Sequence, residues 1–312
     1  MPYKISHIAQ ILDVPTIPTD TEITELIIDS RKITYPAHSL FFALVSDRRD
    51  GHDFIASAYQ AGVRAFVVSK PIDETLFPDA VFLVVADTLA ALQQLAGYHR
   101  SQFSYPVIGI TGSNGKTVVK EWLYQLLKWD YSIVRSPRSY NSQIGVPLSV
   151  WKMNSNHNLA IFEAGISKPG EMEKLAAIIR PTIAVLTAMG PAHDEGFLDR
   201  GHKLSEKLKL FEGAIDPERV QLETWIFLGD QTQLTAVKGE TITIPFTDKA
   251  SIENVLTCWS VMRQLGYSIE TIAPRMLELQ PVGMRLEIKK GLNQSLILND
   301  TYSLDLDSLS IA

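Results

Sequence analysis

The sequence contains a single cysteine among its 312 residues, Cys258, so no disulfide can form within the chain. Small secreted domains that lack a large core rely on several disulfides, and one lone cysteine fits a reducing compartment better. Cys258 falls in a segment with helical spacing. We therefore expect it to be a small buried apolar residue rather than a reactive group.

Long apolar runs and long basic runs are also missing. No window approaches the roughly 20 apolar residues that a membrane span needs, and the first residues show no signal-peptide pattern. The formal charge is −6 without any Lys/Arg cluster, so neither nucleic-acid binding nor membrane-surface binding is expected. We expect a soluble, cytoplasmic protein. Small phosphorylated ligands stay possible, because backbone N–H groups and one or two cations suffice to bind them.

The length predicts two or three domains. The first hundred residues alternate short apolar runs with helical spacing, which predicts a small α/β domain ending near residues 99–102. Its expected strands are 39–45, 65–68 and 81–85, and its expected helices are 54–62 and 88–98.

A second α/β unit begins after Pro106. A strand at 107–111 is followed by a glycine-rich turn and then by apolar residues at helical spacing up to Leu127. Strands that alternate with helices predict a parallel sheet covered on both faces, with ligands at the carboxyl ends of its strands. The other expected strands are 159–162 and 183–187, and the expected helices are 171–179, 203–212 and 252–265.

The last segment has a strand pattern at 295–300 and then the opening of a helix at 308–312. A domain that begins with a strand and stops there would be incomplete, so we expect a truncated third domain. The predicted limits are 1–103 for the first domain, 104–283 for the second and 284–312 for the start of the third.

The turn Gly112-Ser113-Asn114-Gly115-Lys116-Thr117 has the order that a triphosphate site needs. Glycines let backbone N–H groups face phosphate oxygens, the helix N-terminus adds positive potential, and Lys116 supplies a cation. Thr117 can offer its hydroxyl to Mg²⁺. The match to the general P-loop is imperfect, because Ile110 stands where the first glycine is expected, and an ordinary strand–helix turn is the alternative.

Glu163 ends the predicted strand 159–162. A carboxylate at a strand end is often only a solvated residue. In a parallel sheet with the loop 112–117, it becomes a candidate Mg²⁺ ligand.

Residues 110–117 resemble the nucleotide loop of the Mur ligases, which departs from the general P-loop in the same way. Further segments resemble motifs of that family in the same order along the chain. They are 141–149, Glu163-Ala164-Gly165, Pro169-Gly170-Glu171, Ala192-His193, Asn254, Gly283-Met284-Arg285 and Asp300-Thr301-Tyr302.

Three N-terminal segments, 29–32, 40–44 and 50–55, resemble most the family members that add D-alanyl-D-alanine. Residues 139–143 also resemble the form that is fused to an alanine racemase. The chain departs from the family pattern at Ala188-Met189, Ser167-Lys168 and Ser303, which leaves details of substrate contact open.

The resemblance implies phosphoryl transfer from ATP to the terminal carboxylate of UDP-N-acetylmuramoyl-tripeptide, followed by attack of the D-alanyl-D-alanine amine on the acyl phosphate. It implies two Mg²⁺ ions, the first held by Thr117 and Glu163 and the second by Glu163 and His193. Asn254 would face adenine, and Arg285 would approach the phosphates or ribose. A monomer is expected.

The resemblance also implies that Lys207 is carbamoylated and supports a metal. It gives Lys116, Lys207 and His193 as the catalytic residues. Lys203 and Lys207 stand one helical turn apart, and a solvated basic stripe is the alternative. A structural role is likewise the alternative for His193.

Residues at the UDP-muramoyl end are implied to be Ser30, Arg31, Asp50, Gly51 and His52, with Asn141 as a further substrate contact. An ordinary turn with a surface arginine is the alternative.

We expect the chain alone to bind its ligands but to ligate poorly. Two competing functions stay open: another Mur or folylpolyglutamate-type ligase, and a non-catalytic nucleotide-binding module of a fusion.

Overall fold

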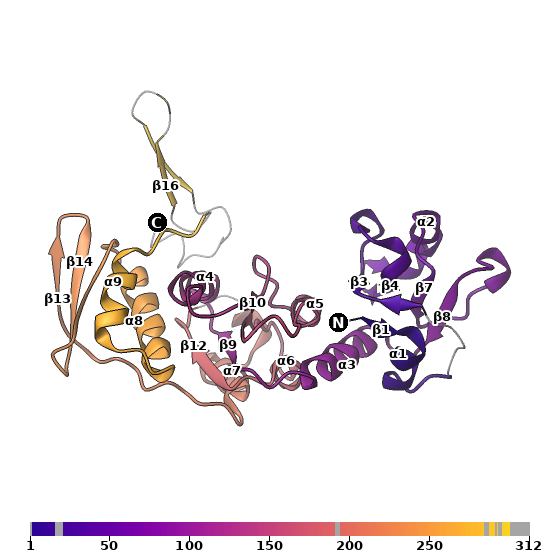
Figure 1. Cartoon of the computed structure of the whole chain (residues 1–312), viewed down its shortest axis with the longest axis horizontal. Coiled ribbons are helices and arrows are strands. Elements are labelled where there is room, and N and C mark those ends of the chain that lie inside the picture. Colours follow the sequence, from indigo (N-terminus) through magenta and orange to yellow (C-terminus); the bar gives the residue numbers. More distant parts are fainter. Residues whose placement is uncertain are drawn as a thin grey trace. The chain divides into compact units, whose positions relative to one another are not determined.

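The computed structural model describes residues 2–15, 21–190, 194–283, 287–290, 292 and 295–299. The chain forms two compact units, residues 1–104 with 143–155 and residues 105–142 with 156–312. Each unit contains its own parallel sheet (Figure 1). The predicted α/β class, with a small first domain and a second domain built like a P-loop ATPase, is confirmed.

The first unit is built on the parallel sheet β3 (Glu25–Ile27), β4 (Ser39–Phe42), β7 (Ala65–Val68) and β8 (Val81–Val84), in that order. Its helices are α1 (Ile5–Ile11), α2 (Ile55–Gln60) and α3 (Thr88–Ser101). All residues of β4 and β7 are buried, and successive side chains enter cores on opposite faces of the sheet. Near-continuous apolar runs are what a two-sided parallel sheet requires.

Short elements complete this unit. Two antiparallel pairs are β1 (Tyr3–Lys4) with β2 (Glu22–Ile23), and β5 (Val45–Ser46) with β6 (Arg49–Asp50). The 3₁₀ turns are η1 (Ser30–Lys32), η2 (Pro36–His38), η3 (Gly51–Phe54) and η4 (Glu74–Leu76).

Residues 143–155, with helix α5 (Gly145–Val150), pack into the first unit, although the predicted limits 104–283 placed them in the second. Trp151 Nε1 donates a hydrogen bond to Thr24 O at 2.8 Å, and His99 Nε2 lies 3.0 Å from Met153 O. Trp151 is buried in the first unit's core. Contacts between residues distant in sequence, rather than chain order, therefore assign this segment.

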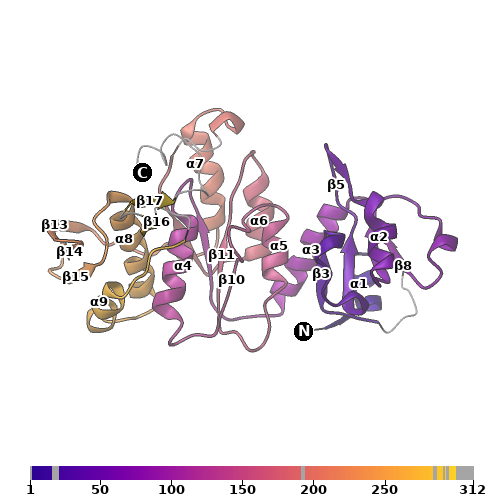
Figure 2. The ribbon, with the colours of Figure 1, turned by 90° about the horizontal axis from the view of Figure 1, so that it is seen from above.

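The second unit is built on four parallel strands in the order β10 (Ile133–Arg135), β11 (Leu159–Glu163), β9 (Val107–Thr111) and β12 (Ile183–Leu186). Figure 2 shows helix α4 (Lys116–Leu127) and helix α6 (Glu171–Ile179) on opposite faces of these strands. The other helical elements are α7 (Arg200–Leu208), α8 (Lys249–Gln264), α9 (Ile269–Leu277), η5 (Asp194–Gly196) and η6 (Lys209–Phe211). The predicted helix 203–212 is thus α7 continued by η6.

A second sheet of this unit was not predicted. It is antiparallel and contains β13 (Leu222–Leu228), β14 (Gln231–Ala236) and β15 (Thr241–Ile244). Alternate residues of β14 and β15 enter the core that α4 and α8 share. The predicted strand 295–300 is found as β17 (Leu296–Asn299), which pairs with β16 (Glu287–Lys290). The predicted helix opening at 308–312 lies outside the described residues.

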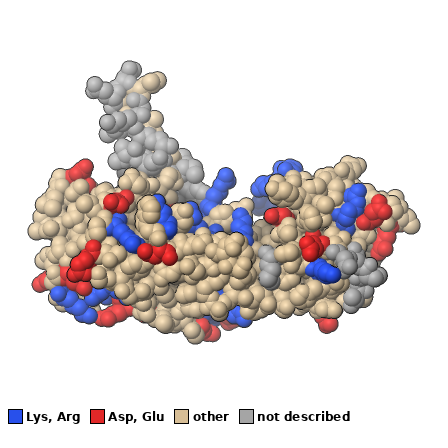
Figure 3. All heavy atoms as spheres, viewed as in Figure 1, with Lys and Arg blue, Asp and Glu red and all other residues tan. Residues whose placement is uncertain are grey.

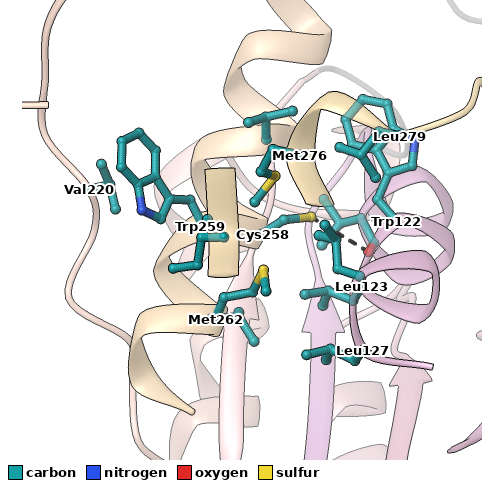
Figure 4. Close-up of a cluster of buried hydrophobic side chains, with 14 of the residues drawn as sticks. Trp122, Leu123, Leu127, Val220, Cys258, Trp259, Met262, Met276 and Leu279 are labelled. Atoms are coloured by element: carbon teal, nitrogen blue, oxygen red, sulfur yellow. Dashed lines mark hydrogen bonds between the residues drawn. The ribbon is translucent and has the colours of Figure 1, made fainter. Parts of the chain in front are cut away.

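Cys258 lies in α8 among apolar side chains, as predicted (Figure 4). Its thiol is fully buried beside Met262 and Met276, and Sγ lies 3.8 Å from Val119 O. Burial raises the pKa of the Cys258 thiol far above its usual range. Because thiolates are the reactive form, this cysteine is a packing residue.

Charged side chains of both signs are interspersed on the face drawn in Figure 3, with no broad patch of one sign. Among the described residues, no helix combines the length and the apolar character that crossing a bilayer would take.

Candidate functional site

The candidate site of the second unit forms where strands β11, β9 and β12 end side by side. Strand β9 pairs with β11 on one edge and with β12 on the other. Thr111 closes β9, Glu163 closes β11, and Thr187 follows β12. Parallel strands bring their carboxyl ends to one edge of the sheet, which is where open α/β sheets bind ligands.

The loop between β9 and α4 depends on two glycines with positive φ. Gly112 has φ 142° and Gly115 has φ 86°. A Cβ on Gly112 would lie 2.0 Å from Thr187 Oγ1, and a Cβ on Gly115 would lie 2.3 Å from Asn254 Oδ1. Both the backbone conformation and the close approach therefore require glycine at these two positions. The absence of a glycine at Ile110 has a simple reason, because that residue is a buried residue of β9, one position before the strand ends.

Backbone carbonyls after β12 hold the loop. Ala188 O accepts hydrogen bonds from Ser113 N at 2.9 Å and from Asn114 N at 3.2 Å. Ser113 Oγ donates to Gly190 O at 3.0 Å. Lys116 Nζ turns back on its own loop and donates to Gly112 O at 2.7 Å and to Ser113 O at 2.8 Å. A cation and a helix N-terminus are thus gathered at one point, as a phosphate site needs.

Thr117 and Glu163 meet, as the sequence predicts. Thr117 Oγ1 lies 3.2 Å from Glu163 Oε2 and 2.9 Å from Ser139 Oγ. Asn141 Nδ2 lies 3.5 Å from the same carboxylate oxygen. Asn141, assigned to substrate binding from the sequence, is therefore next to the candidate metal ligands.

The Thr117 hydroxyl and the Glu163 carboxylate are oxygen ligands of the kind that Mg²⁺ binds. No group of three or more His, Cys, Asp or Glu side chains able to hold a metal occurs in the part of the chain that the structure describes. Mg²⁺ does not need such a group, because it is commonly bound by one or two carboxylates together with substrate phosphates and water. His193, predicted to hold the second metal together with Glu163, lies outside the described residues, as does Arg285.

Lys120 is a residue of this site that the sequence analysis missed. Its side chain is fully buried, and Nζ lies 2.9 Å from Glu163 Oε1. The signal was present, because Lys120 stands one helical turn after Lys116 on the row that continues into buried Leu123 and Leu127. A lysine on a buried row needs a partner of opposite charge.

Lys203 and Lys207 are buried, with 1% and 3% of their surface exposed. The alternative of a solvated basic stripe is therefore wrong. Lys207 Nζ donates to Gly112 O at 3.1 Å. Burial, followed by the charges of Lys116 and Lys203, lowers the pKa of Lys207 to about 7. A large part of this amine is consequently neutral, and thus nucleophilic, near neutral pH.

Lys203 fixes the segment after β12. Its Nζ donates to Gly190 O and to Asp194 Oδ1, both at 2.6 Å. Gly190 O is also the acceptor for Ser113 Oγ, so α7 and the glycine-rich loop share one anchor.

Asn254 lies in α8, buried beside Gly115. It is therefore next to the loop and not a surface residue of the helix, while its contact with adenine stays a prediction.

The candidate substrate residues of the first unit follow the carboxyl ends of β3 and β4. Asp29 Oδ1 accepts from Arg31 N at 3.1 Å, and its carboxylate takes two further bonds from the Arg31 guanidinium, both at 2.8 Å. These bonds lower the pKa of Asp29 to about 2. The Arg31 side chain stays 78% exposed, so its outer face is open to an anion. Ser30 belongs to the same turn, η1.

Asp50, Gly51 and His52 form a tightly bonded turn. His52 Nε2 accepts from Ser69 N at 3.0 Å, so the neutral ring carries its proton on Nδ1, which lies 2.5 Å from Asp50 Oδ1. Lys70 also pairs with Asp50. A Cβ on Gly51 would lie 2.5 Å from Leu44 N. Both ring nitrogens of His52 are thus engaged within the protein and stabilise this turn, while contact of His52 with substrate stays a prediction.

Known proteins share this organisation. Residues 110–255 match the family description "Mur ligase middle domain", and residues 22–100 match "Mur ligase family, catalytic domain". The UDP-N-acetylmuramoyl-tripeptide–D-alanyl-D-alanine ligase of Bacillus subtilis (strain 168) is 30% identical over 318 residues, which cover 91% of this chain and 68% of that protein.

Two solved structures are similar in fold. MurF from Acinetobacter baumannii superposes with a TM-score of 0.88 at 24% identity, over 100% of this chain and 75% of that one. The MurF ligase of Thermotoga maritima in complex with ADP has a TM-score of 0.78 at 24% identity, over 92% of this chain and 73% of that one.

Proposed function

Because this chain belongs to the Mur ligase family, we propose that it binds ATP and acts in the ligation of D-alanyl-D-alanine to UDP-N-acetylmuramoyl-tripeptide. The observation that carries the proposal is the contact between Thr117 and Glu163 at the ends of β9 and β11, with the Lys116 amine folded onto the adjoining glycine-rich loop. The relative from Bacillus subtilis bears the name of this reaction. The ADP complex of the Thermotoga maritima protein supports nucleotide as the ligand.

The proposed chemistry joins two anions. A carboxylate is a poor electrophile, so the γ-phosphoryl group of ATP is transferred to it, giving an acyl phosphate and ADP. The amine of D-alanyl-D-alanine attacks the acyl carbon, and phosphate leaves from the tetrahedral intermediate. Cations must screen the approach of the phosphate and the carboxylate.

In this scheme Lys116 exchanges its two loop carbonyls for phosphate oxygens. Both carbonyls belong to the loop that would surround the phosphates, so Lys116 already lies beside the proposed phosphate site. Thr117 and Glu163 would hold Mg²⁺, which supplies charge neutralisation when it is bound. Asn141 stands beside Glu163, where it can orient the carboxylate or the incoming substrate.

Lys207 is proposed to react with CO₂. A neutral amine is required for carbamate formation, and a pKa of about 7 provides it near neutral pH. The carbamate would turn a repelling cation beside Lys116 and Lys203 into an anion that both can stabilise. NMR of the chain in ¹³C-bicarbonate should show one slowly exchanging carbamate carbon, absent from Lys207→Met. The same signal in the variant, or none in the parent, would contradict this assignment.

Arg31 is proposed to bind the diphosphate of the UDP-linked substrate. Asp29 holds the guanidinium from one side and leaves its other side exposed. Arginine suits this role because its planar fork binds phosphate in two places. Lys32 in the same turn offers a matched control, since it is an exposed cation outside the Asp29 pair.

Calorimetric titration with UDP-N-acetylmuramoyl-tripeptide tests the proposal directly. Arg31→Ala should weaken binding by about 10-fold or more, the loss of one charge-assisted bidentate contact, while Lys32→Ala should stay within about 3-fold of the parent. Equal losses in both variants would indicate general attraction by positive charge. No binding by the parent, with the nucleotide still bound, would mean that the family is right but the acceptor is wrong.

Two other functions can be distinguished with the same chain, nucleotide and substrates. For another Mur or folylpolyglutamate-type ligase, the chain would bind nucleotide and prefer a different acceptor in a competition series. For a non-catalytic module, nucleotide binding would persist without phosphate release when both substrates are present. The chain covers 68% of the Bacillus subtilis relative, so binding is a more direct test than turnover.

A further inference from the structure

We infer that Lys120 is a positioning residue that holds Glu163 by one carboxylate oxygen and so presents the other oxygen to the metal and phosphate. This inference rests on the proposed nucleotide function and deepens it. Lys120 stands three residues after Thr117 in α4, so its side chain lies on the same face of the helix as the candidate metal ligand.

Lys120 is completely enclosed by protein. Its side chain and that of Glu163 are both 0% exposed. Nζ donates to Ser136 O at 2.9 Å and to Arg138 O, and it lies 2.9 Å from Glu163 Oε1 and 3.2 Å from Glu121 Oε1. Two donors of the ammonium bond the carbonyls of Ser136 and Arg138, while Glu163 Oε1 is held by the charge of Lys120 and accepts no hydrogen bond from the described residues.

The two oxygens of Glu163 therefore have separate partners. Oε1 faces Lys120, while Oε2 faces Thr117 Oγ1 and Asn141 Nδ2. A carboxylate that is free to turn could offer either oxygen, or both, to a cation. With Oε1 held, Glu163 can act only as a one-oxygen ligand through Oε2, on the side of the glycine-rich loop.

Lys120 also shapes the segment that completes the site. It binds the carbonyls of Ser136 and Arg138, and Arg138 has a φ of 51°, a strained value for a residue with a side chain. Ser136 Oγ accepts from Glu163 N at 3.2 Å, which ties the same segment to β11. Ser139, which contacts Thr117, lies within this segment.

A purely structural ion pair would have a different signature. Removing Lys120 would then lower stability but leave the response of nucleotide binding to Mg²⁺ unchanged. If Lys120 positions Glu163, its removal weakens the metal-dependent part of binding in particular. Loss of a residue that orients a metal ligand typically costs about 10- to 100-fold in metal affinity.

The experiment measures ADP binding by calorimetry with and without Mg²⁺, and Mn²⁺ binding in the presence of ADP by electron paramagnetic resonance. K120M removes the charge. K120R keeps it, but its fork would take both oxygens of Glu163 and withdraw Oε2 from the metal. K128M changes an exposed lysine near the end of the same helix and is the control.

In K120M and K120R we expect metal-free ADP affinity within about 3-fold of the parent, Mg²⁺ enhancement reduced by about 10-fold or more, and weaker Mn²⁺ binding. K128M should match the parent. Should K120M fail to fold, K120R decides alone, because it retains the charge that neutralises Glu163. A folded variant with the parent's Mg²⁺ enhancement would overturn the inference and leave nucleotide binding intact. A parent that binds no nucleotide would overturn both.

Discussion

Lys207→Met removes an amine that the fold buries beside two other lysines. The pKa of Lys207 falls from 10.5 to about 7, first because of burial and then because of Lys116 and Lys203. A fall of this size corresponds to roughly 5 kcal/mol of cost for the protonated amine. The variant loses one hydrogen bond to Gly112 O, but that carbonyl keeps the bond from Lys116.

The sign of the pH dependence follows from proton binding. Between pH 7 and 10.5 the unfolded chain keeps a proton on Lys207 that the folded chain has released. The free energy of unfolding therefore rises with pH across this window, by up to about 1.4 kcal/mol per pH unit, and the cost is fully present below pH 7. Lys207→Met should lack this contribution. Allowing for the lost hydrogen bond and for relaxation, we expect it to be about 2 kcal/mol more stable than the parent below pH 7.

The assay is urea unfolding of both chains across this pH range in buffers purged of CO₂, so that carbamate does not form. The difference in unfolding free energy between variant and parent should shrink as the pH rises. Lys174→Met, which changes an exposed lysine in α6, is the control and should follow the parent. Parallel pH profiles for the parent and Lys207→Met would refute the reasoning, because they would mean that Lys207 is solvated in the folded chain.

Three further changes test other parts of the structure. Gly115→Ala places a Cβ 2.3 Å from Asn254 Oδ1, so ADP affinity measured by calorimetry should fall by about 10-fold or more. Gly229→Ala is the control, because Gly229 also has a positive φ but nothing within 4 Å, and it should leave the affinity unchanged. Equal ADP affinities of the two variants would show that the loop adjusts to the added methyl group. Burial lowers the pKa of His99 from 6.5 to about 4, so between these pH values the unfolded chain binds a proton that the folded chain does not. The thermal midpoint should therefore fall as the pH drops from 6.5 to 4, and a midpoint that stays constant over this range would contradict the burial of a neutral His99. Leu123→Ala empties a fully buried site against α8 and should cost about 2–5 kcal/mol in urea unfolding; a loss below about 1 kcal/mol would mean that the core collapses around it.

Part of the site could be predicted from the sequence because its pattern is local. Residues 107–111 are five consecutive strand residues, all buried, followed by two obligatory glycines and an amphipathic helix. Hydrophobic periodicity and turn chemistry determine each of these over a few residues. Glu163 was found for the same reason, because it closes a recognisable strand.

The strands of the antiparallel sheet β13–β15 were not predicted from the sequence. Residues 231–236 alternate between partly exposed and buried positions, and Gly229 and Gly239 adopt the positive φ of turns, so the hairpin signal was in the sequence. Strand β13 does not show the corresponding alternation of apolar and polar residues, because Trp225 and Phe227 are apolar and yet about half exposed. Hydrophobicity alone does not reveal which apolar residues stay exposed in the folded chain.

The sequence by itself determined the α/β class, the phosphate loop and the burial of Cys258, because each depends on the order of neighbouring residues. Only the tertiary structure decided that Lys120 neutralises Glu163, that Lys207 is buried enough to lose its proton near pH 7, and that residues 143–155 pack with the first unit. These properties arise when chain folding removes charged groups from water and brings together residues that are distant in sequence. Local propensity contains no information about which partners they will meet.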